Sequence, residues 1–137
     1  MRAASLIITV DRGSLKAYRV VETATRGASL KLVQAFEIPN ADAESRTNHT
    51  RPLADLPQLE MEENRRICRQ LAQEIATIVR QMPGEGWSLA APTSIYWGIV
   101  GVLPTEIHER IVEHVESDLV KTEPAKLPAH FLSLQPI

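Results

Sequence analysis

Residues 5–38 read SLIITVDRGSLKAYRVVETATRGASLKLVQAFEI and contain three strand-like runs in close succession. Residues 5–10 are apolar and β-branched, as in a buried strand, whereas residues 15–22 and 30–38 roughly alternate apolar and polar side chains. Turn-forming residues separate the runs, and Gly13 tolerates the backbone angles of a tight turn. Because short connections favour pairing of successive strands, we expect an antiparallel three-stranded meander.

A long helical pattern follows at residues 60–82. Its apolar side chains recur at spacings of three, four and seven residues, namely at Met61, Cys68, Leu71, Ile75, Ile78 and Met82. This stripe predicts a helix that packs against the sheet and places Cys68, the single cysteine, in the core. Residues 83–86, PGEG, are expected to end the helix.

The remainder of the chain alternates short strands and helices. Residues 87–91 predict a buried strand, and residues 95–103 a helix that Pro104 ends. Residues 111–116 favour a last strand by their β-branched content, although their apolar residues also recur at every fourth position, as on a helix. A proline then begins a short helical element at residues 124–127.

The predicted order of elements is therefore β-β-β-α-β-α-β-α, an α/β fold with helices packed on a mixed sheet. The 137 residues suffice for one hydrophobic core, so we expect a single domain spanning residues 1–137. The net charge of −2 argues against a wholesale electrostatic clamp on nucleic acid. Apolar runs far shorter than ~20 residues, a start without a signal-peptide pattern and a single cysteine lead us to expect a cytoplasmic protein that does not enter a membrane.

Residues 39–59 form a predicted polar loop with three prolines, and connections of this length are usually functional or mobile. The loop and the following helix carry side chains suited to contacts with RNA or another partner: Arg46, Asn48, His49, Arg51, Arg65, Arg66 and Arg69. The alternative is a solvated surface. Residues 44–70 carry five acids for five arginines, and no aromatic side chain that could stack on a base.

Catalytic and metal sites have few candidates. His49 is the weak candidate for a general base, because it is the one loop side chain expected to titrate near neutral pH. Asp11, Glu116 and Asp118 follow predicted strands and could converge on metal ions, although Asp11 also suits a turn. The six glycines never form a phosphate-binding pattern, so no cofactor is expected.

Residues 115–131, VESDLVKTEPAKLPAHF, resemble the closing signature of the bacterial host-attachment protein family, in which a Lys-Asp-Leu-Thr run leads to a Leu-Pro-X-His-Leu-like end. Ser117, Val120 and Phe131 stand where that family usually has Lys, Thr and Leu. The opening ITVDRG, the AYR strand and the LAAP segment after the long helix also fit. The resemblance spans nearly the whole chain.

That family is in turn similar to the middle domain of archaeal and eukaryotic peptide-chain release factors, with its ribonuclease-H-like order of strands, long loop, long helix and strand-helix-strand-helix run. This likeness implies association with the ribosome, tRNA or another protein. The Gly-Gly-Gln release element has no counterpart, because the loop has no glycine and Gln58 follows a proline. We therefore expect a binding protein, with enzymatic activity left open.

The resemblance and the residues leave two alternatives to that expectation. One is a hydrolase that acts on an RNA or an ester resembling peptidyl-tRNA, with His49 as the base. The other is a factor that affects attachment indirectly. A second copy of the chain could also pair with an exposed edge strand.

Overall fold

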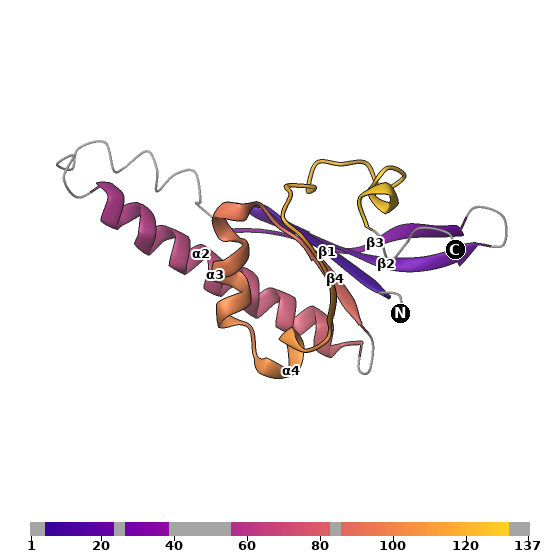
Figure 1. Cartoon of the computed structure of the whole chain (residues 1–137), viewed down its shortest axis with the longest axis horizontal. Coiled ribbons are helices and arrows are strands. Elements are labelled where there is room, and N and C mark those ends of the chain that lie inside the picture. The colour runs from indigo at the N-terminus through magenta and orange to yellow at the C-terminus, as the bar shows by residue number, and fades with distance from the viewer. Residues whose placement is uncertain (1–4, 24–26, 39–55, 83–85, 132–137) are drawn as a thin grey trace.

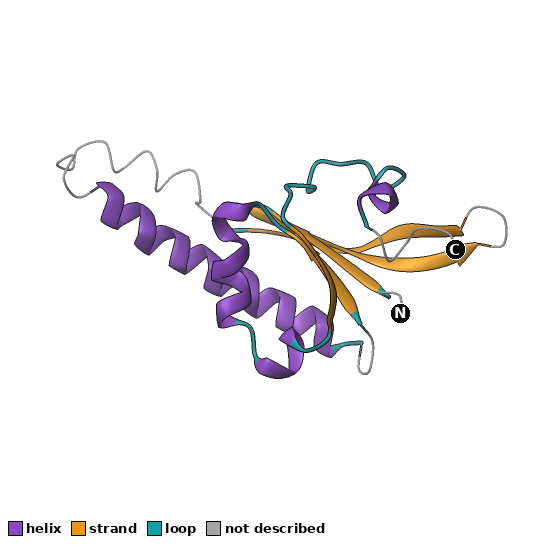
Figure 2. Cartoon of the chain, viewed as in Figure 1, coloured by secondary structure: helices purple, strands orange, loops and turns teal. Residues whose placement is uncertain are grey.

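The computed structural model of the chain describes residues 5–23, 27–38, 56–82 and 86–131. These residues form one mixed five-stranded sheet, in the order β3-β2-β1-β4-β5, with helices packed on it (Figure 1). The predicted α/β class with a mixed sheet is therefore confirmed. Figure 2 shows the sheet as a twisted layer beside the long helix.

The first three strands form the predicted antiparallel meander. They are β1 (Leu6–Val10), β2 (Ser14–Thr23) and β3 (Gly27–Glu37). The register between β2 and β3 shifts between Ala17 and Tyr18, which marks a β-bulge. β3 is one edge of the sheet, so the predicted pairing with a second copy would have to occur there or at β5.

The other strands are β4 (Trp87–Ala90), which lies parallel to β1, and β5 (Ile111–Val115), which lies parallel to β4. β1 thus pairs on both sides and all five of its residues are buried, as its continuous apolar run predicts. Residues 111–116 favoured a strand over a helix, and β5 confirms that preference.

The long helix α2 (Leu56–Arg80) begins four residues earlier than predicted and ends two residues earlier. The predicted loop at residues 39–59 was therefore wrong at its end, since residues 56–59 are helical. Pro57 misled the prediction, yet proline is tolerated in the first turn because those N–H groups have no partner within the helix. Residues 39–55 lie outside the described residues.

Three further helical elements complete the described order: α3 (Thr93–Val102), α4 (Thr105–His108) and the 3-10 helix η3 (Leu127–His130). The predicted helix at residues 95–103 is α3, and Leu103 before Pro104 has the extended backbone expected there. The predicted element order was wrong in two details. α4 is an additional helix between α3 and β5. The last element is a 3-10 helix where an α-helix was predicted, and it begins after residues 124–126, which form a turn.

The sheet has a different covering on each face. α2, α3 and α4 pack on one face, and the C-terminal segment with η3 lies over the other (Figure 1). The larger core lies under the helices and contains the predicted stripe of α2 from Cys68, only 4% exposed, to Ile78, with Met82 packed against it. The predicted burial of Met61 was wrong, because 56% of this side chain is exposed in the part of α2 that precedes the core. The smaller core joins Tyr18 and Ile7 to Leu127 and Phe131. Among the helices of the described residues, none is long and apolar enough to cross a membrane.

Candidate functional site

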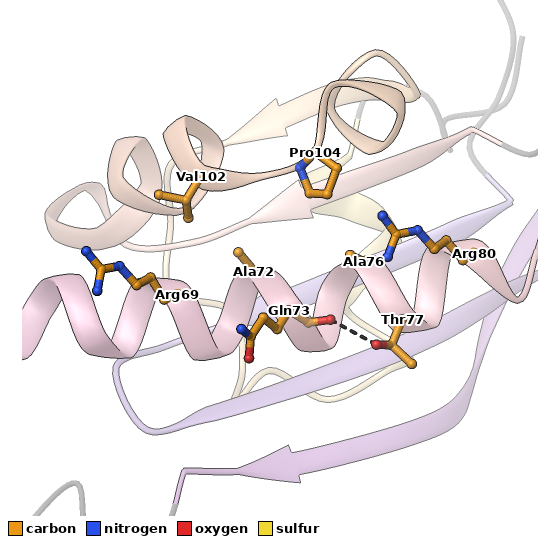
Figure 3. A pocket seen from close by; sticks show the side chains of 8 residues that line it. All are labelled: Arg69, Ala72, Gln73, Ala76, Thr77, Arg80, Val102 and Pro104. Carbon is orange, nitrogen blue, oxygen red and sulfur yellow. Dashed lines mark hydrogen bonds between the residues drawn. The ribbon is translucent and has the colours of Figure 1, made fainter.

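Two adjoining cavities lie between α2 and α3. The first, here called the Arg80 cavity, has a volume of about 470 Å³. Figure 3 shows Arg69 and Arg80 on α2 at either side of Ala72 and Ala76, with Val102 and Pro104 across from them; Gln73 and Thr77 complete the lining. The alanines lack bulky side chains, and this leaves open space between the two arginines.

The second, the Trp97 cavity, has a volume of about 410 Å³. Its lining comes from both helices: Asn64, Arg65, Cys68, Arg69, Ser94, Trp97, Gly98, Gly101 and Val102. Arg69 and Val102 line both cavities, so the two cavities adjoin, and we call them together the α2–α3 groove. Cavities of several hundred Å³ are of the size that binds small molecules or single groups of a larger ligand.

The helical period explains how α2 presents this surface. Arg65 and Arg69 are four residues apart, so they lie one above the other on one face. They flank the apolar stripe that α2 buries, and their guanidinium groups reach the rim of the groove. Arg66 lies one position further round the helix and does not line either cavity.

α3 contributes an aromatic ring to the groove. Ile95, Tyr96 and Ile99 of this helix are fully buried, which turns Trp97 outward, where 63% of it is exposed. The Tyr96 and Trp97 rings meet edge to face, with centroids 5.0 Å apart and planes at 75°. The indole ring thus packs on the buried tyrosine along one edge, while most of its surface stays exposed.

The charge of the groove is positive. The side chains of Arg65 and Arg69 have no hydrogen bond or ion pair with any residue that the structure describes. Arg80 is different, because its guanidinium group is 2.7 Å from Glu106 Oε1, with both side chains mostly exposed. The two cavities have no aspartate or glutamate among their described lining residues. The arrangement therefore suits an anionic ligand.

Cys68 lies at the floor of the groove and behaves as a core residue. Its Sγ atom donates a hydrogen bond to the carbonyl oxygen of Ile95, at 3.6 Å. Burial raises the pKa of the thiol above its ordinary value, and this outweighs the opposite effect of the positive charge on Arg12. The neutral thiol is thus the stable form, which does not favour a nucleophilic role.

The structure places the predicted contact residues in two groups. Arg65 and Arg69 come together at the groove, whereas Arg66 lies beside it. The other four candidates, Arg46, Asn48, His49 and Arg51, lie outside the described residues. The general-base role of His49 therefore stays a prediction.

Two of the three candidate metal ligands, Asp11 and Asp118, have local hydrogen-bond partners. Asp11 Oδ1 accepts hydrogen bonds from the backbone N–H groups of Gly13 and Ser14, at 2.8 and 2.7 Å, and from the Ser14 hydroxyl group, at 2.9 Å. Asp118 Oδ1 accepts one from the N–H of Val120, at 3.3 Å, and Glu116 is exposed. Within the described ranges, no three acidic, histidine or cysteine side chains are grouped closely enough to hold a metal ion.

Trp97 is the residue that the sequence analysis missed. Residues 44–70 contain no aromatic side chain that could stack on a base, and Trp97 lies 28 positions after Arg69 in the chain. The sequence did contain a signal that Trp97 is exposed. The apolar residues of α3 that face the core leave Trp97 on the other side of the helix, together with Gly101. Trp97 faces the arginines of α2 because of the way in which the two helices pack, and the local sequence does not contain this information.

The fold and the groove define an α/β domain with one mixed sheet and a basic groove between two helices on one face. The chain belongs to the family described as "Protein required for attachment to host cells", whose family model matches residues 6–131. This match confirms the family resemblance drawn from residues 115–131 and the opening strand. No curated protein matches the chain.

Proposed function

We propose that this protein is a non-enzymatic RNA-binding domain that associates with the ribosome or with tRNA through the α2–α3 groove. One observation carries the proposal: Arg65 and Arg69 line a groove without described acids and have no partner among the described residues. Guanidinium groups that no carboxylate neutralises are well placed to hold phosphate oxygens.

The size of the groove favours a single strand over a duplex. Its two cavities hold about 410 and 470 Å³, and each is bounded by helices that a stiff double helix would have to displace. RNA is recognised mainly through single-stranded segments, whose bases are free to leave the stack. A net charge of −2 for the whole chain is compatible with this, because Arg65 and Arg69 bring two positive charges together on one face of α2.

The likeness to the middle domain of peptide-chain release factors supports a role in translation. The order of three antiparallel strands, a long helix, a strand and a helix in the described residues agrees with part of the order that this likeness implies. The Gly-Gly-Gln element is missing from the sequence, so we propose binding without release of the peptide. We also place the protein in the cytoplasm, with any effect on host attachment arising indirectly. Cell fractionation tests this location, since recovery outside the cytoplasm would contradict it.

Ribosome co-sedimentation and RNA binding test the proposal directly. The double variant Arg65→Gln/Arg69→Gln should lose most of its affinity for ribosomes and for a single-stranded oligonucleotide at low salt. A matched control is Arg19→Gln/Lys31→Gln, which removes the same charge from exposed residues paired across β2 and β3. The control should bind as the native protein does. Equal loss in both variants would indicate attraction by net charge and would contradict a site in the groove.

A deletion separates the groove from the predicted loop. Removing residues 42–50 takes out Arg46, Asn48 and His49 and leaves α2 intact. We expect the melting temperature to stay within a few degrees, because shortening a loop changes the closure entropy by only about 0.6 kcal/mol per factor of two in length. Ribosome association should weaken if the loop contributes contacts, while oligonucleotide binding by Arg65 and Arg69 should persist.

A further inference from the structure

We infer that the Trp97 cavity takes one nucleobase of a single-stranded RNA, stacked on the indole ring, while Arg65 and Arg69 hold the adjoining phosphates. This inference rests on the proposed function and names the contact that would distinguish a base-bearing strand from an anion without a base. It follows from the exposure of Trp97, the open space at Gly101 and the two guanidinium groups on the facing helix, which have no partner among the described residues.

The two tryptophans of the chain have opposite environments. Trp87 is fully buried, and its indole Nε1–H donates a hydrogen bond to the carbonyl oxygen of Ile107 at 2.9 Å. Trp97 is 63% exposed and has no such bond with any residue in the described part of the chain. A large aromatic ring left in water contributes little to folding, and tryptophan exposed beside arginine is typical of binding surfaces.

Gly101 gives planar groups access to this ring. Trp97 and Gly101 are four positions apart on α3, and a helical side chain normally covers the surface about one turn towards the N-terminus. A Cβ atom at Gly101 would have no atom within 4 Å, so close packing does not require glycine there. Glycine lowers helix stability, yet here it leaves the space next to the indole ring open.

Other contacts prepare the ring for stacking. The edge-to-face contact with the buried Tyr96 favours one direction of the indole plane in the unbound protein. Arg65 and Arg69 lie on the opposite wall, separated by about 6 Å along the helix axis. A ribose-phosphate chain that follows α2 could therefore place phosphates near both guanidinium groups and turn one base towards α3.

Base stacking separates RNA from the other anionic partners that the charge alone would allow. Every nucleobase has a flat π face, and stacking on an aromatic side chain contributes to binding without dependence on base identity. The carboxylates of an acidic peptide and the headgroup of an anionic lipid match the arginines, but these groups themselves have no planar ring for Trp97. Because the groove offers both features within one cavity, we assign it to single-stranded RNA.

The test compares two probes that differ only in their bases. One is an octamer of uridylate, and the other is an abasic ribose-phosphate octamer with the same charge. The native protein should bind the base-bearing octamer about tenfold more tightly, as expected for one stacked base. The red-shifted emission of the exposed Trp97 should be quenched on binding, while the emission of the buried Trp87 stays constant.

Three variants test whether the preference for the base-bearing octamer arises at Trp97. Trp97→Ala should remove the preference for the base-bearing octamer while leaving the affinity for the abasic octamer unchanged. Gly101→Leu should do the same, because its side chain would cover the indole ring. Trp97→Phe retains an aromatic face and should keep most of the preference. Circular dichroism and urea unfolding confirm that each variant is folded.

The outcomes distinguish this inference from the proposed function. Equal affinity of the native protein for both octamers would overturn base stacking and leave RNA binding by the arginines in place. Binding of neither octamer would overturn both. Tighter binding to polyglutamate or to vesicles containing phosphatidylserine than to the uridylate octamer would assign the groove to a protein or a membrane surface instead.

Discussion

Gly98 of α3 lies so close to Cys68 of α2 that a Cβ atom at position 98 would come within 2.7 Å of the cysteine Sγ atom. No real Cβ atom is found at that distance from a neighbour, so glycine is required for the two helices to approach as they do. The same approach sets the width of the α2–α3 groove, because Gly98 and Cys68 both line the Trp97 cavity.

Gly98→Ala should lower the free energy of unfolding by about 1–3 kcal/mol, because the added methyl group overpacks the helix contact. Gly101→Ala is the matched control on the same helix. It meets no atom within 4 Å and should raise stability by about 0.5–1 kcal/mol through better helix propensity. Urea unfolding measures both. The double variant Gly98→Ala/Cys68→Ala should recover part of the loss, and equal effects at the two glycines would show that the helix contact does not matter.

The free energy of unfolding should fall as the pH rises above the ordinary pKa of a thiol. Burial raises the pKa of Cys68 in the folded protein, so above that ordinary pKa the unfolded chain loses a proton that the folded chain keeps. Urea unfolding between neutral pH and pH 10 should show the decline, and Cys68→Ala should flatten it. Burial also raises the pKa of Tyr18, but its contribution begins at higher pH. A thiol reagent such as dithionitrobenzoate should react with Cys68 only on unfolding.

Glu106→Ala should leave stability nearly unchanged and strengthen binding of an anionic oligonucleotide. The pair between Arg80 and Glu106 is exposed, and such pairs contribute at most about 0.5–1 kcal/mol. Without Glu106, the guanidinium group of Arg80 becomes available at the groove. The slope of log affinity against log salt concentration should steepen by about 0.7 for one added phosphate contact. Glu123→Ala, which removes the same charge from the exposed pair with Lys126, should leave the slope unchanged.

Trp87→Phe should destabilise the protein by about 2–3 kcal/mol. The smaller ring leaves a cavity in a fully buried site, and the carbonyl oxygen of Ile107 loses its hydrogen-bond donor. Trp97→Phe makes the same change at the exposed tryptophan and should shift stability by no more than about 0.5 kcal/mol. Urea unfolding measures the stability of both variants. If they lose similar amounts of free energy of unfolding, Trp97 packs as a core residue, contrary to its proposed role at the groove.

Asp11→Ala should lower stability by about 1–2 kcal/mol, because three hydrogen bonds to Oδ1 hold the turn between β1 and β2. Asp11→Asn keeps an oxygen acceptor and should lose at most half as much. Thermal unfolding with and without Mg²⁺ checks the alternative role. A melting temperature that rises with Mg²⁺ in the native protein, and not in Asp11→Asn, would assign the carboxylate to metal binding instead.

Local sequence patterns predicted most elements of the fold. Alternation in residues 15–22 and 30–38 indicated β2 and β3, and the 3.6-residue stripe indicated α2, because each pattern reflects burial of one face. Boundaries were predicted less well. α2 begins at Leu56 because proline fits a first helical turn, and the last element is a 3-10 helix with Pro128 at its start. Half of the candidate site followed from the charge pattern of α2, since Arg65 and Arg69 share a face at a spacing of four.

The amino-acid sequence alone determined the strands, the helices, the burial of Cys68 and the membership of the host-attachment family, since periodicity and short motifs are properties of contiguous residues. Only the tertiary structure decided that β4 pairs with β1, which makes β1 a central strand buried on both faces. It also decided that Trp97 faces Arg65 and Arg69. These contacts join residues about 30 to 80 positions apart, and they depend on how the helices pack on the sheet, where Gly98 allows α3 to approach α2.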